Sequence, residues 1–320
     1  MLISGFTFAR NTHKLCYPYV ESIRSILPIC DEFIIAIGRG DNDDCTRERV
    51  AEIGDPKIRI IDTEWTDLDQ LRRRIFSQQT NLALDHCSGK WCFYLQSDEV
   101  VHERYLATIQ EACRYFNDSK EVDGFLFKYK HFWGDYRHHI VSHKWYPREI
   151  RIIRNNGTIV SVGDAQSFRY AGGGKVNAVQ LDADIFHYGH VRDPRITCVR
   201  KLAMETIYWG DNIKVEIPPV FDYGSLEKLS RYSGTHPAVM HDMIAAMNWK
   251  HLLQYHGKSN VRLPHERFKY RFLTFIEQKV LRGSGCEFWG YKPYRLLRRL
   301  SREFARHLQH THSNSSADSE

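Results

Sequence analysis

Two carboxylates, Asp98 and Glu99, lie shortly after the apolar run at residues 91–95 and precede an amphipathic helical pattern. In an open α/β sheet, ligands bind in the crevice at the carboxyl ends of the strands. A carboxylate at that edge can hold a divalent cation, which in turn neutralises the diphosphate of a nucleotide. The alternative is a strand followed by a helix N-terminus, where the helix dipole favours acidic residues. The two carboxylates alone support both interpretations about equally.

The segments around these acids alternate between strand-like and helix-like patterns. Short apolar runs predict strands, whereas apolar residues three or four positions apart predict helices. Strands that alternate with helices predict parallel βαβ units with right-handed crossovers. The first half of the chain is therefore expected to form a doubly wound α/β sheet. The predicted strands are 2–9, 33–37, 57–61 and 91–95, and the predicted helices are 17–27, 46–53 and a long one marked by Leu71, Ile75 and Leu82.

Polar residues gather where the predicted strands end. Arg10 and Asn11 follow the first strand, and a loop rich in aspartate follows the second. The loop also fits a turn that leads into a helix N-cap at Asp44 or Thr46. A turn explains less well why acids accumulate at the ends of two neighbouring strands. Such carboxylates can bind the ribose hydroxyls and base edges of a nucleoside.

Composition limits the class of protein. The 320 residues are 42% hydrophobic, which is enough for one large or two smaller folded units. The net charge of +6 is compatible with anionic partners, and nucleic acid is not expected among them. No apolar run reaches the roughly 18 residues of a transmembrane helix, and Met1 leads into a strand pattern without a signal peptide. Eight cysteines without a CxxC pair indicate reduced thiols. We expect a cytoplasmic protein.

The order of several short motifs resembles family 2 of the glycosyltransferases. These motifs are ISGFTFARN, DEFIIAIG, DNDDCT, QQTNLALDHCSGKW and CFYLQSDEVVHE. Members of that family have the GT-A fold and use nucleotide-activated sugars. The resemblance implies an α/β fold with a GT-A type doubly wound mixed sheet, whose first half is a Rossmann-like nucleotide-binding unit. It covers residues 1–192; residues 193–309 are expected to form a helical C-terminal region, and residues 310–320 a disordered tail.

The resemblance also implies roles for single residues. Asp44 with Thr46 matches the Asp-x-Thr of the family near the nucleoside, whereas Asn81 and Lys90 match positions that frame the fourth strand. The Asp-x-Asp metal motif is replaced by Gln96, Ser97 and Asp98. Asp98 is then the expected ligand of a divalent cation, Mn²⁺ or Mg²⁺, and the loss of the first acid leaves metal dependence open. The expected contacts of the nucleotide-sugar are Thr7, Arg10, Asn11, Asp41, Asp44, Gln96, Ser97 and Arg192.

Further candidates lie between residues 145 and 192. The run at 145–154 resembles the strand beneath the acceptor, and Asp164 stands where relatives place the general base. Glu149 is its rival, and a plain turn residue is an equally supported interpretation of Asp164. In IFHYGHVR, His187 is the expected second metal ligand, and His190 and Arg192 are expected to face phosphate oxygens; histidines that are merely hydrogen-bonded in the core are the alternative interpretation.

Beyond residue 194 the resemblance ends. Residues 197–208 and 241–254 have helical patterns, and 267–281 place several apolar residues on one face, which predicts a helix packed on the core. Residues 292–306 combine arginines with leucines, which indicates either a basic helix on an anionic membrane surface or a solvated helix. The apolar residues of the 267–281 face are Phe268, Phe272, Phe275, Ile276 and Val280.

Together these patterns predict a glycosyltransferase. It would move a sugar from a nucleotide-sugar donor to a hydroxyl of a saccharide or lipid-linked acceptor, with inversion and with a divalent cation. The enzyme would work in the cytoplasm, with peripheral contact to the inner face of the membrane as an open possibility. A sugar-nucleotide nucleotidyltransferase is disfavoured because no Gly-rich phosphate loop follows the first strand. A non-catalytic carbohydrate- or nucleotide-binding relative is the other alternative, suggested by Gln96.

Overall fold

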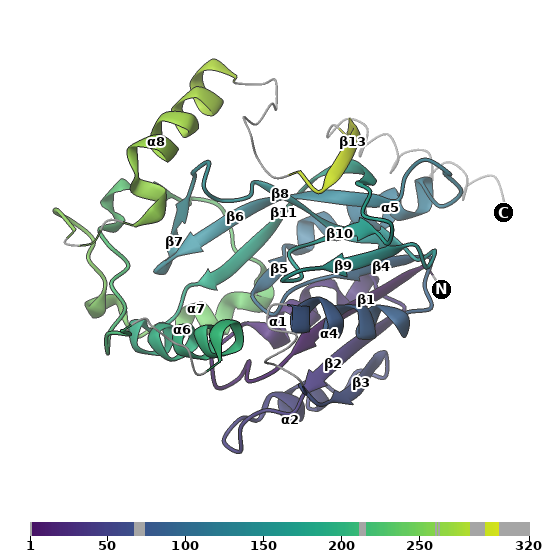
Figure 1. The fold of residues 1–320 in the computed structure, drawn as a ribbon, viewed down its shortest axis with the longest axis horizontal. Helices are drawn as coiled ribbons and strands as arrows, with labels where there is room; N and C mark the ends of the chain where they lie inside the picture. Colours follow the sequence, from purple (N-terminus) through teal and green to yellow (C-terminus); the bar gives the residue numbers. More distant parts are fainter. Residues whose placement is uncertain are drawn as a thin grey trace.

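The computed structural model describes residues 2–66, 74–210, 216–259, 261, 263–281 and 292–300. Its centre is an 11-stranded mixed sheet (Figure 1). A separate two-stranded hairpin lies beside the sheet. The strands are β1 (Ile3–Ala9), β2 (Glu32–Gly38), β3 (Ile58–Thr63), β4 (Trp91–Tyr94), β5 (Glu99–Val101), β6 (Gly124–Trp133), β7 (Asp135–Ile140), β8 (Arg148–Arg154), β11 (Val176–His190), β12 (Ser230–Arg231) and β13 (Tyr294–Arg299), and the hairpin is β9 (Ile159–Val162) and β10 (Ser167–Tyr170).

The first half of the sheet is parallel, as the apolar runs predict. β1 pairs with β2 on one side and with β4 on the other, and β3 continues the parallel order beyond β2. β1, β2 and β4 are almost entirely buried because both of their faces are covered. The carboxyl ends of β1, β2 and β4 therefore meet at one edge, where Asp98 and the aspartate-rich loop lie.

The second half of the sheet reverses direction. β8 is antiparallel to β4, and β6 is antiparallel to both β8 and β7. The long strand β11 runs parallel to β6 and antiparallel to the short β5, with His187 opposite Glu99. A parallel half joined to antiparallel strands confirms the predicted α/β fold with a mixed sheet.

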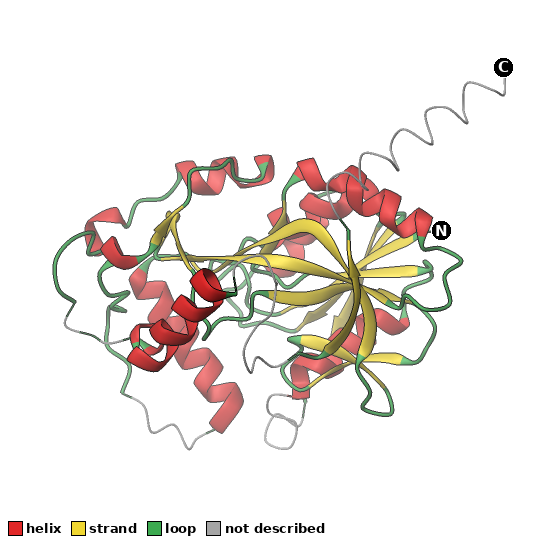
Figure 2. Cartoon of the chain, turned by 90° about the horizontal axis from the view of Figure 1, so that it is seen from above, coloured by secondary structure: helices red, strands yellow, loops and turns green. Residues whose placement is uncertain are grey.

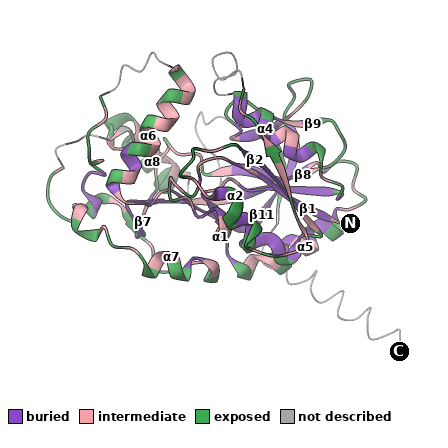
Figure 3. Ribbon diagram, turned by 90° about the horizontal axis from the view of Figure 1, so that it is seen from below, coloured by how far each residue is buried: buried purple, intermediate pink, exposed green. Residues whose placement is uncertain are grey.

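Helices cover both faces of the twisted sheet, which fans out in Figure 2. Apolar residues of α1 and α5 pack on one face, and those of α4 pack with β9 and β10 on the other. Figure 3 shows the buried residues concentrated along the sheet. The helices are α1 (Tyr19–Ile26), α2 (Thr46–Ala51), α4 (Arg74–Asp85), α5 (Leu106–Tyr115), α6 (Pro194–Trp209), α7 (His241–Ala245) and α8 (Phe268–Phe275), with a π-helical turn at Ile276–Val280. Leu71, predicted to begin α4, lies outside the described residues.

The C-terminal region departs from the predictions in three places. The helix predicted at 241–254 is wrong in length, because α7 ends at Ala245 and is followed by short 3-10 turns. The helix predicted for 292–306 is also wrong, because β13 forms there and pairs with β11. The third error concerns α8, whose apolar face is exposed and does not pack on the core. Residues 301–320, with the predicted disordered tail, lie outside the described part.

Two further expectations concern the described residues only. No helix among them is long and apolar enough to cross a bilayer. Seven of the eight cysteines fall among them and all seven are free thiols, as the spacing predicts, whereas Cys286 lies outside.

Candidate functional site

Asp98 lies in a tight turn between β4 and β5, at the carboxyl edge of the parallel half. The backbone of the turn is fixed by side chains from neighbouring elements. The hydroxyl of Thr7 on β1 donates to the carbonyl of Leu95, and the hydroxyl of Ser97 donates to the carbonyl of Phe8 over 3.3 Å. Thr7 and Ser97, both expected to contact the nucleotide, therefore hold the turn in place.

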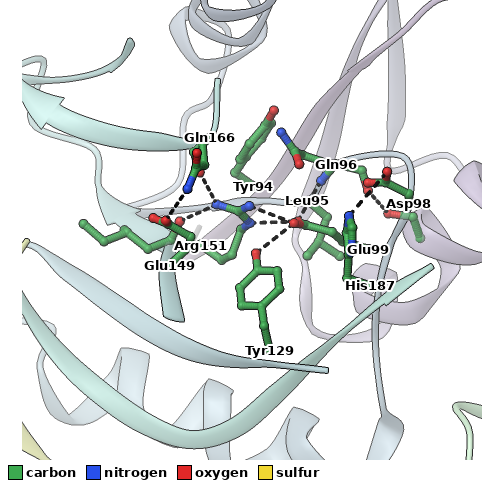
Figure 4. Close-up of polar contacts among 12 residues, drawn as sticks. Tyr94, Leu95, Gln96, Asp98, Glu99, Tyr129, Glu149, Arg151, Gln166 and His187 are labelled. Atoms are coloured by element: carbon green, nitrogen blue, oxygen red, sulfur yellow. Dashed lines mark hydrogen bonds and ion pairs between the residues drawn. The ribbon is translucent and has the colours of Figure 1, made fainter. Parts of the chain in front are cut away.

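A buried ion pair anchors the other end of the same turn (Figure 4). Arg151 of β8 donates two hydrogen bonds of 2.7 Å to the carboxylate of Glu99, and both side chains are fully buried. The hydroxyl of Tyr129 and the backbone N–H of Gln96 donate to the same carboxylate, over 2.8 and 3.1 Å. Because Glu99 directly follows Asp98, this network fixes where the Asp98 side chain can lie.

Asp98 faces His187 across the pairing of β5 with β11. The Oδ2 atom of Asp98 lies 3.6 Å from the Nε2 atom of His187, and both residues are buried. Burial on its own would raise the pKa of Asp98, but His187, Arg200 and Arg192 outweigh it and lower that pKa well below its usual range. Asp98 is therefore a carboxylate, as a cation ligand must be.

The orientation of His187 is set by a second histidine, His131, which is its register partner on β6. The two Nδ1 atoms are 3.1 Å apart, and Nε2 of His131 lies 2.8 Å from the carbonyl oxygen of Tyr146. A carbonyl only accepts, so Nε2 of His131 carries its proton. Burial lowers the pKa of His131 well below its usual range, so its Nδ1 accepts from Nδ1 of His187. In the neutral form of His187 with its proton on Nδ1, Nε2 carries the lone pair that a cation beside Asp98 would need.

Residue 189 is a glycine, and a larger side chain there would intrude on both Asp98 and His187. A Cβ atom at Gly189 would lie 2.6 Å from Oδ2 of Asp98 and 2.7 Å from Nε2 of His187. A carboxylate and an imidazole that face each other fit a divalent cation whose remaining ligands come from phosphate and water. Within the described part of the chain, no group of three or more His, Cys, Asp or Glu side chains could hold a metal ion. The protein thus supplies a partial site that a bound diphosphate could complete.

Two guanidinium groups lie beside Asp98. Arg192 is fully buried; it donates to the carbonyls of Leu15 and Gly189, and its Nε has no hydrogen-bond partner among the described residues. Arg200 of α6 donates to the hydroxyl of Tyr17 over 2.6 Å, and both arginines lie over that ring. Two cations at the carboxyl edge fit an anionic group such as a diphosphate.

The loop after β2 forms a pocket of about 360 Å³. The carboxylate of Asp41 pairs with Lys14 at 2.8 Å, and the backbone N–H of Asp41 donates to Oδ1 of Asn11. Asp44 accepts from the backbone N–H of Lys14, and Arg10 donates to the carbonyl of Arg39. The structure thus brings these predicted nucleotide contacts together, at the ends of β1 and β2. The pocket is lined by residues that include Asp41, Asp44, Asp62 and Thr63.

The two candidate bases differ in surroundings. Asp164 is exposed in the turn between β9 and β10. The next residue, Ala165, accepts a 3.2 Å hydrogen bond from the amide of Gln96, which ties that turn to the Asp98 turn. Glu149 is buried, and its Oε1 accepts from the amide of Gln166 over 2.8 Å. Burial raises the pKa of Glu149 from 4.5 to about 7, against the opposing charge of Arg151.

We expect Glu149→Gln to stabilise the folded chain above pH 7 and to have little effect below pH 4.5. Between these values the folded chain retains a proton on Glu149 that the unfolded chain has lost, so stability falls as the pH rises through this window. The shift corresponds to about 3 kcal/mol. Urea unfolding at several pH values measures the difference. An equal effect at every pH would mean that the substitution changes packing only.

Several residues of the site were absent from the sequence predictions. His131, Arg151 and Arg200 belong to it through tertiary contacts, and no motif marks any of them. His190, predicted to face phosphate, instead stacks on Trp133 with ring centroids 4.7 Å apart. The in-register pairing of His187 with His131 could have been found only from the pairing of β6 with β11.

No family model and no curated protein matches this chain. Among solved structures, TarS 1–349 of S. aureus aligns with a TM-score of 0.34 and 12% identity over 67% of each chain. A longer TarS chain aligns over 68% of this chain and 41% of its own, with a TM-score of 0.36 and 14% identity. Glucosyl-3-phosphoglycerate synthase from Mycobacterium tuberculosis, in complex with Mn²⁺ and UDP-glucose, aligns with 0.28 and 17% identity over 41% of this chain and 44% of its own. At these TM-scores the structural similarities do not assign a function. A functional assignment therefore has to be argued from the site itself.

Proposed function

We propose that the protein is a glycosyltransferase of the GT-A type that moves a sugar from a nucleotide-sugar donor to an acceptor hydroxyl. The observation that carries the proposal is the pair Asp98 and His187, whose Oδ2 and Nε2 atoms face each other at 3.6 Å, beside Gly189, at the sheet edge where β1, β2 and β4 end. The pocket after β2 lies at the same edge and suits the nucleoside. The acceptor is a saccharide or a lipid-linked saccharide.

The leaving diphosphate would lie between the nucleoside pocket and Asp98. A divalent cation bound by Asp98 and His187 would neutralise charge that develops on the diphosphate as the glycosidic bond breaks. Arg192 and Arg200 lie beside Asp98 and would donate hydrogen bonds to phosphate oxygens. Glu99 and Arg151 would not contact the substrate; they would hold the turn that carries Asp98 rigid.

Transfer with inversion needs one carboxylate to take the proton of the acceptor hydroxyl as its oxygen attacks the anomeric carbon. We assign this role to Asp164, because its side chain is exposed while its turn is tied to the Asp98 turn through Gln96. Glu149 is the rival: its raised pKa suits a base, but its full burial keeps it from an acceptor unless the hairpin moves.

A cation-dependent affinity for nucleotide is the first test of this proposal. We expect Mn²⁺ to strengthen UDP binding to the unsubstituted chain, and Asp98→Asn to remove that gain while leaving metal-free binding in place. The affinity for UDP in the presence of Mn²⁺ should fall about 10- to 100-fold, the usual cost of disturbing a metal site. Calorimetric titration of UDP with and without Mn²⁺ measures both quantities.

Gly189→Ala provides a second variant that retains every ligand. Its Cβ atom would occupy the space between Asp98 and His187, so the cation effect should disappear again. Gly172→Ala is a matched control, because its Cβ would meet nothing within 4 Å and because Gly172, like Gly189, has no positive φ. Cation-enhanced binding that persists in folded Asp98→Asn would contradict the metal role.

A non-catalytic nucleotide-binding protein is the second candidate. The observation that favours it is Gln96, whose amide donates to the carbonyl of Ala165 and which cannot supply the missing carboxylate. One measurement, the release of UDP from UDP-sugars, distinguishes the two candidate functions. The proposed enzyme should release UDP from UDP-sugars when offered an acceptor or water, whereas a binding protein should bind UDP without turnover.

A further inference from the structure

Helix α8 contacts the rest of the described chain through its polar side. The hydroxyl of Thr274 accepts from the backbone N–H of His143 over 2.9 Å, and the carboxylate of Glu277 in the following π-helical turn lies 2.7 Å from Nδ1 of the same histidine. The ammonium group of Lys144 lies over the ring of Tyr270. A helix on a protein surface normally turns its apolar side inwards. In α8 the side that faces the protein carries hydroxyl and carboxylate groups.

The opposite side of α8 is an exposed aromatic stripe formed by Phe268, Phe272 and Phe275. Spacings of four and three residues place these rings on one face of the helix. Their exposed fractions are 74%, 52% and 55%, and the rings of Phe268 and Phe272 stack with centroids 6.2 Å apart. Val280, one turn further on, is 65% exposed. Contiguous exposed apolar surface of this kind marks a site of interaction with a protein or a membrane.

Positive charges flank the aromatic stripe. Lys269 and Arg271 are exposed and, at 100° per residue, lie on opposite sides of it. Among the described residues no acid forms an ion pair with either of them, because Glu266 pairs with Lys228 and Glu277 with His143. An apolar stripe with one cation on each side is complementary to an anionic surface with an apolar interior.

A cavity of about 570 Å³ opens beside the stripe, between α8 and the segment that contains β12. Phe275 and Arg271 line it from the helix, and Lys228 and Ser230 line it from the other side. The lining mixes polar and apolar atoms, and Lys228 pairs with Glu266 within it, so Arg271 is the cation that the cavity offers to a headgroup whose acyl chains lie along the rings. Figure 1 shows α8 at the periphery of the molecule, away from β1 to β4, where a flat surface could reach it.

We propose that α8 docks on the surface of an anionic lipid bilayer, with the phenylalanine stripe inserted at the headgroup boundary and the flanking cations at the lipid phosphates. Amphipathic helices with aromatic residues on one face and Lys or Arg at its edges bind membranes in this way. The docking is independent of the proposed transferase activity, because no residue of the Asp98 site takes part in it.

Sedimentation of the full chain with vesicles tests the proposal. We expect binding to phosphatidylcholine vesicles that contain phosphatidylglycerol and little binding to phosphatidylcholine alone. Phe268→Ser combined with Phe272→Ser should lower the partition coefficient about tenfold or more. Lys269→Gln combined with Arg271→Gln should lower it about 30-fold, because each basic residue near an anionic surface contributes about 1 kcal/mol. High salt should weaken binding in the same direction.

Leu202→Ser on α6 is the matched control, since Leu202 is 48% exposed but lies outside the stripe. Its binding should equal that of the unsubstituted chain, and thermal unfolding should show that all variants are folded. Failure of the unsubstituted chain to bind anionic vesicles, or undiminished binding by the double serine variant, would overturn the proposal. A dimer that dissociates on the same serine substitutions would also overturn it, because a second copy would then cover the stripe.

Discussion

Arg151→Met is expected to lower the free energy of unfolding by about 3–5 kcal/mol. The substitution leaves the carboxylate of Glu99 buried without its bidentate partner, and both side chains are fully buried in the structure. Tyr129 and the N–H of Gln96 still donate to that carboxylate, but neither carries a charge. Urea unfolding followed by fluorescence measures the change. The cost comes from the uncompensated charge, so protonation of Glu99 at low pH should recover part of it.

A double-mutant cycle with Glu99→Gln separates the charge from the packing. We expect the double variant to be more stable than Arg151→Met alone, because it no longer buries an isolated charge. Arg47→Met is the matched control: Arg47 makes a similar two-bond contact with Asp62, but both side chains are more than half exposed. Exposed pairs contribute about 0–1 kcal/mol. A loss of similar size in both variants would show that burial is not the cause.

Asp164→Asn is expected to lower the rate of sugar transfer by about 10²- to 10⁴-fold, the usual cost of losing a general base. The amide keeps the shape and most of the hydrogen-bonding capacity of the carboxylate, but it cannot take the proton of the acceptor. Asp164 is exposed in its turn, so the substitution should leave the unfolding free energy almost unchanged. Measuring kcat and the affinity for UDP in the same preparation checks the assignment.

Glu149→Gln is the comparison that makes the Asp164 result informative. If Asp164 is the base, the Gln variant at position 149 should keep most of its activity. A near-parental rate in Asp164→Asn together with a large loss in Glu149→Gln would move the role to Glu149. Changes in UDP affinity that follow the changes in rate would instead indicate a disturbed turn, since Gln96 links this turn to the Asp98 turn.

The parallel half of the sheet could be predicted because its signals are local. Each buried strand is a short apolar run, and the carboxyl-end rule for such sheets locates Asp98 and Asp44 before any contact is known. The role of His187 as a metal ligand could be predicted only from the resemblance to a known family, because no local pattern in the sequence marks it. The contact between His187 and His131 could not be predicted. The two residues are 56 positions apart in the sequence, and only the parallel pairing of β6 with β11 brings them together.

The errors in the C-terminal region have physical causes as well. Periodicity shows that Phe268, Phe272 and Phe275 share a face, but it cannot show whether that face meets the core or the surroundings. β13 has a sequence, YRLLRR, that lacks strict alternation, and its strand form is imposed by pairing with β11. Arg200 joins the site through the position of α6 against Tyr17, which no local pattern in the sequence encodes.

The course of β11 has a consequence for how the molecule assembles. This single strand pairs with β5, β6 and β13, and it carries His187 to a position opposite Glu99. Pairings between segments so far apart in sequence form late, because their loops are costly to close. During synthesis the nucleoside loops would therefore emerge well before the cation ligands meet. Until β11 is added, one edge of β6 has no strand to pair with, so an incomplete chain would expose an edge that favours aggregation.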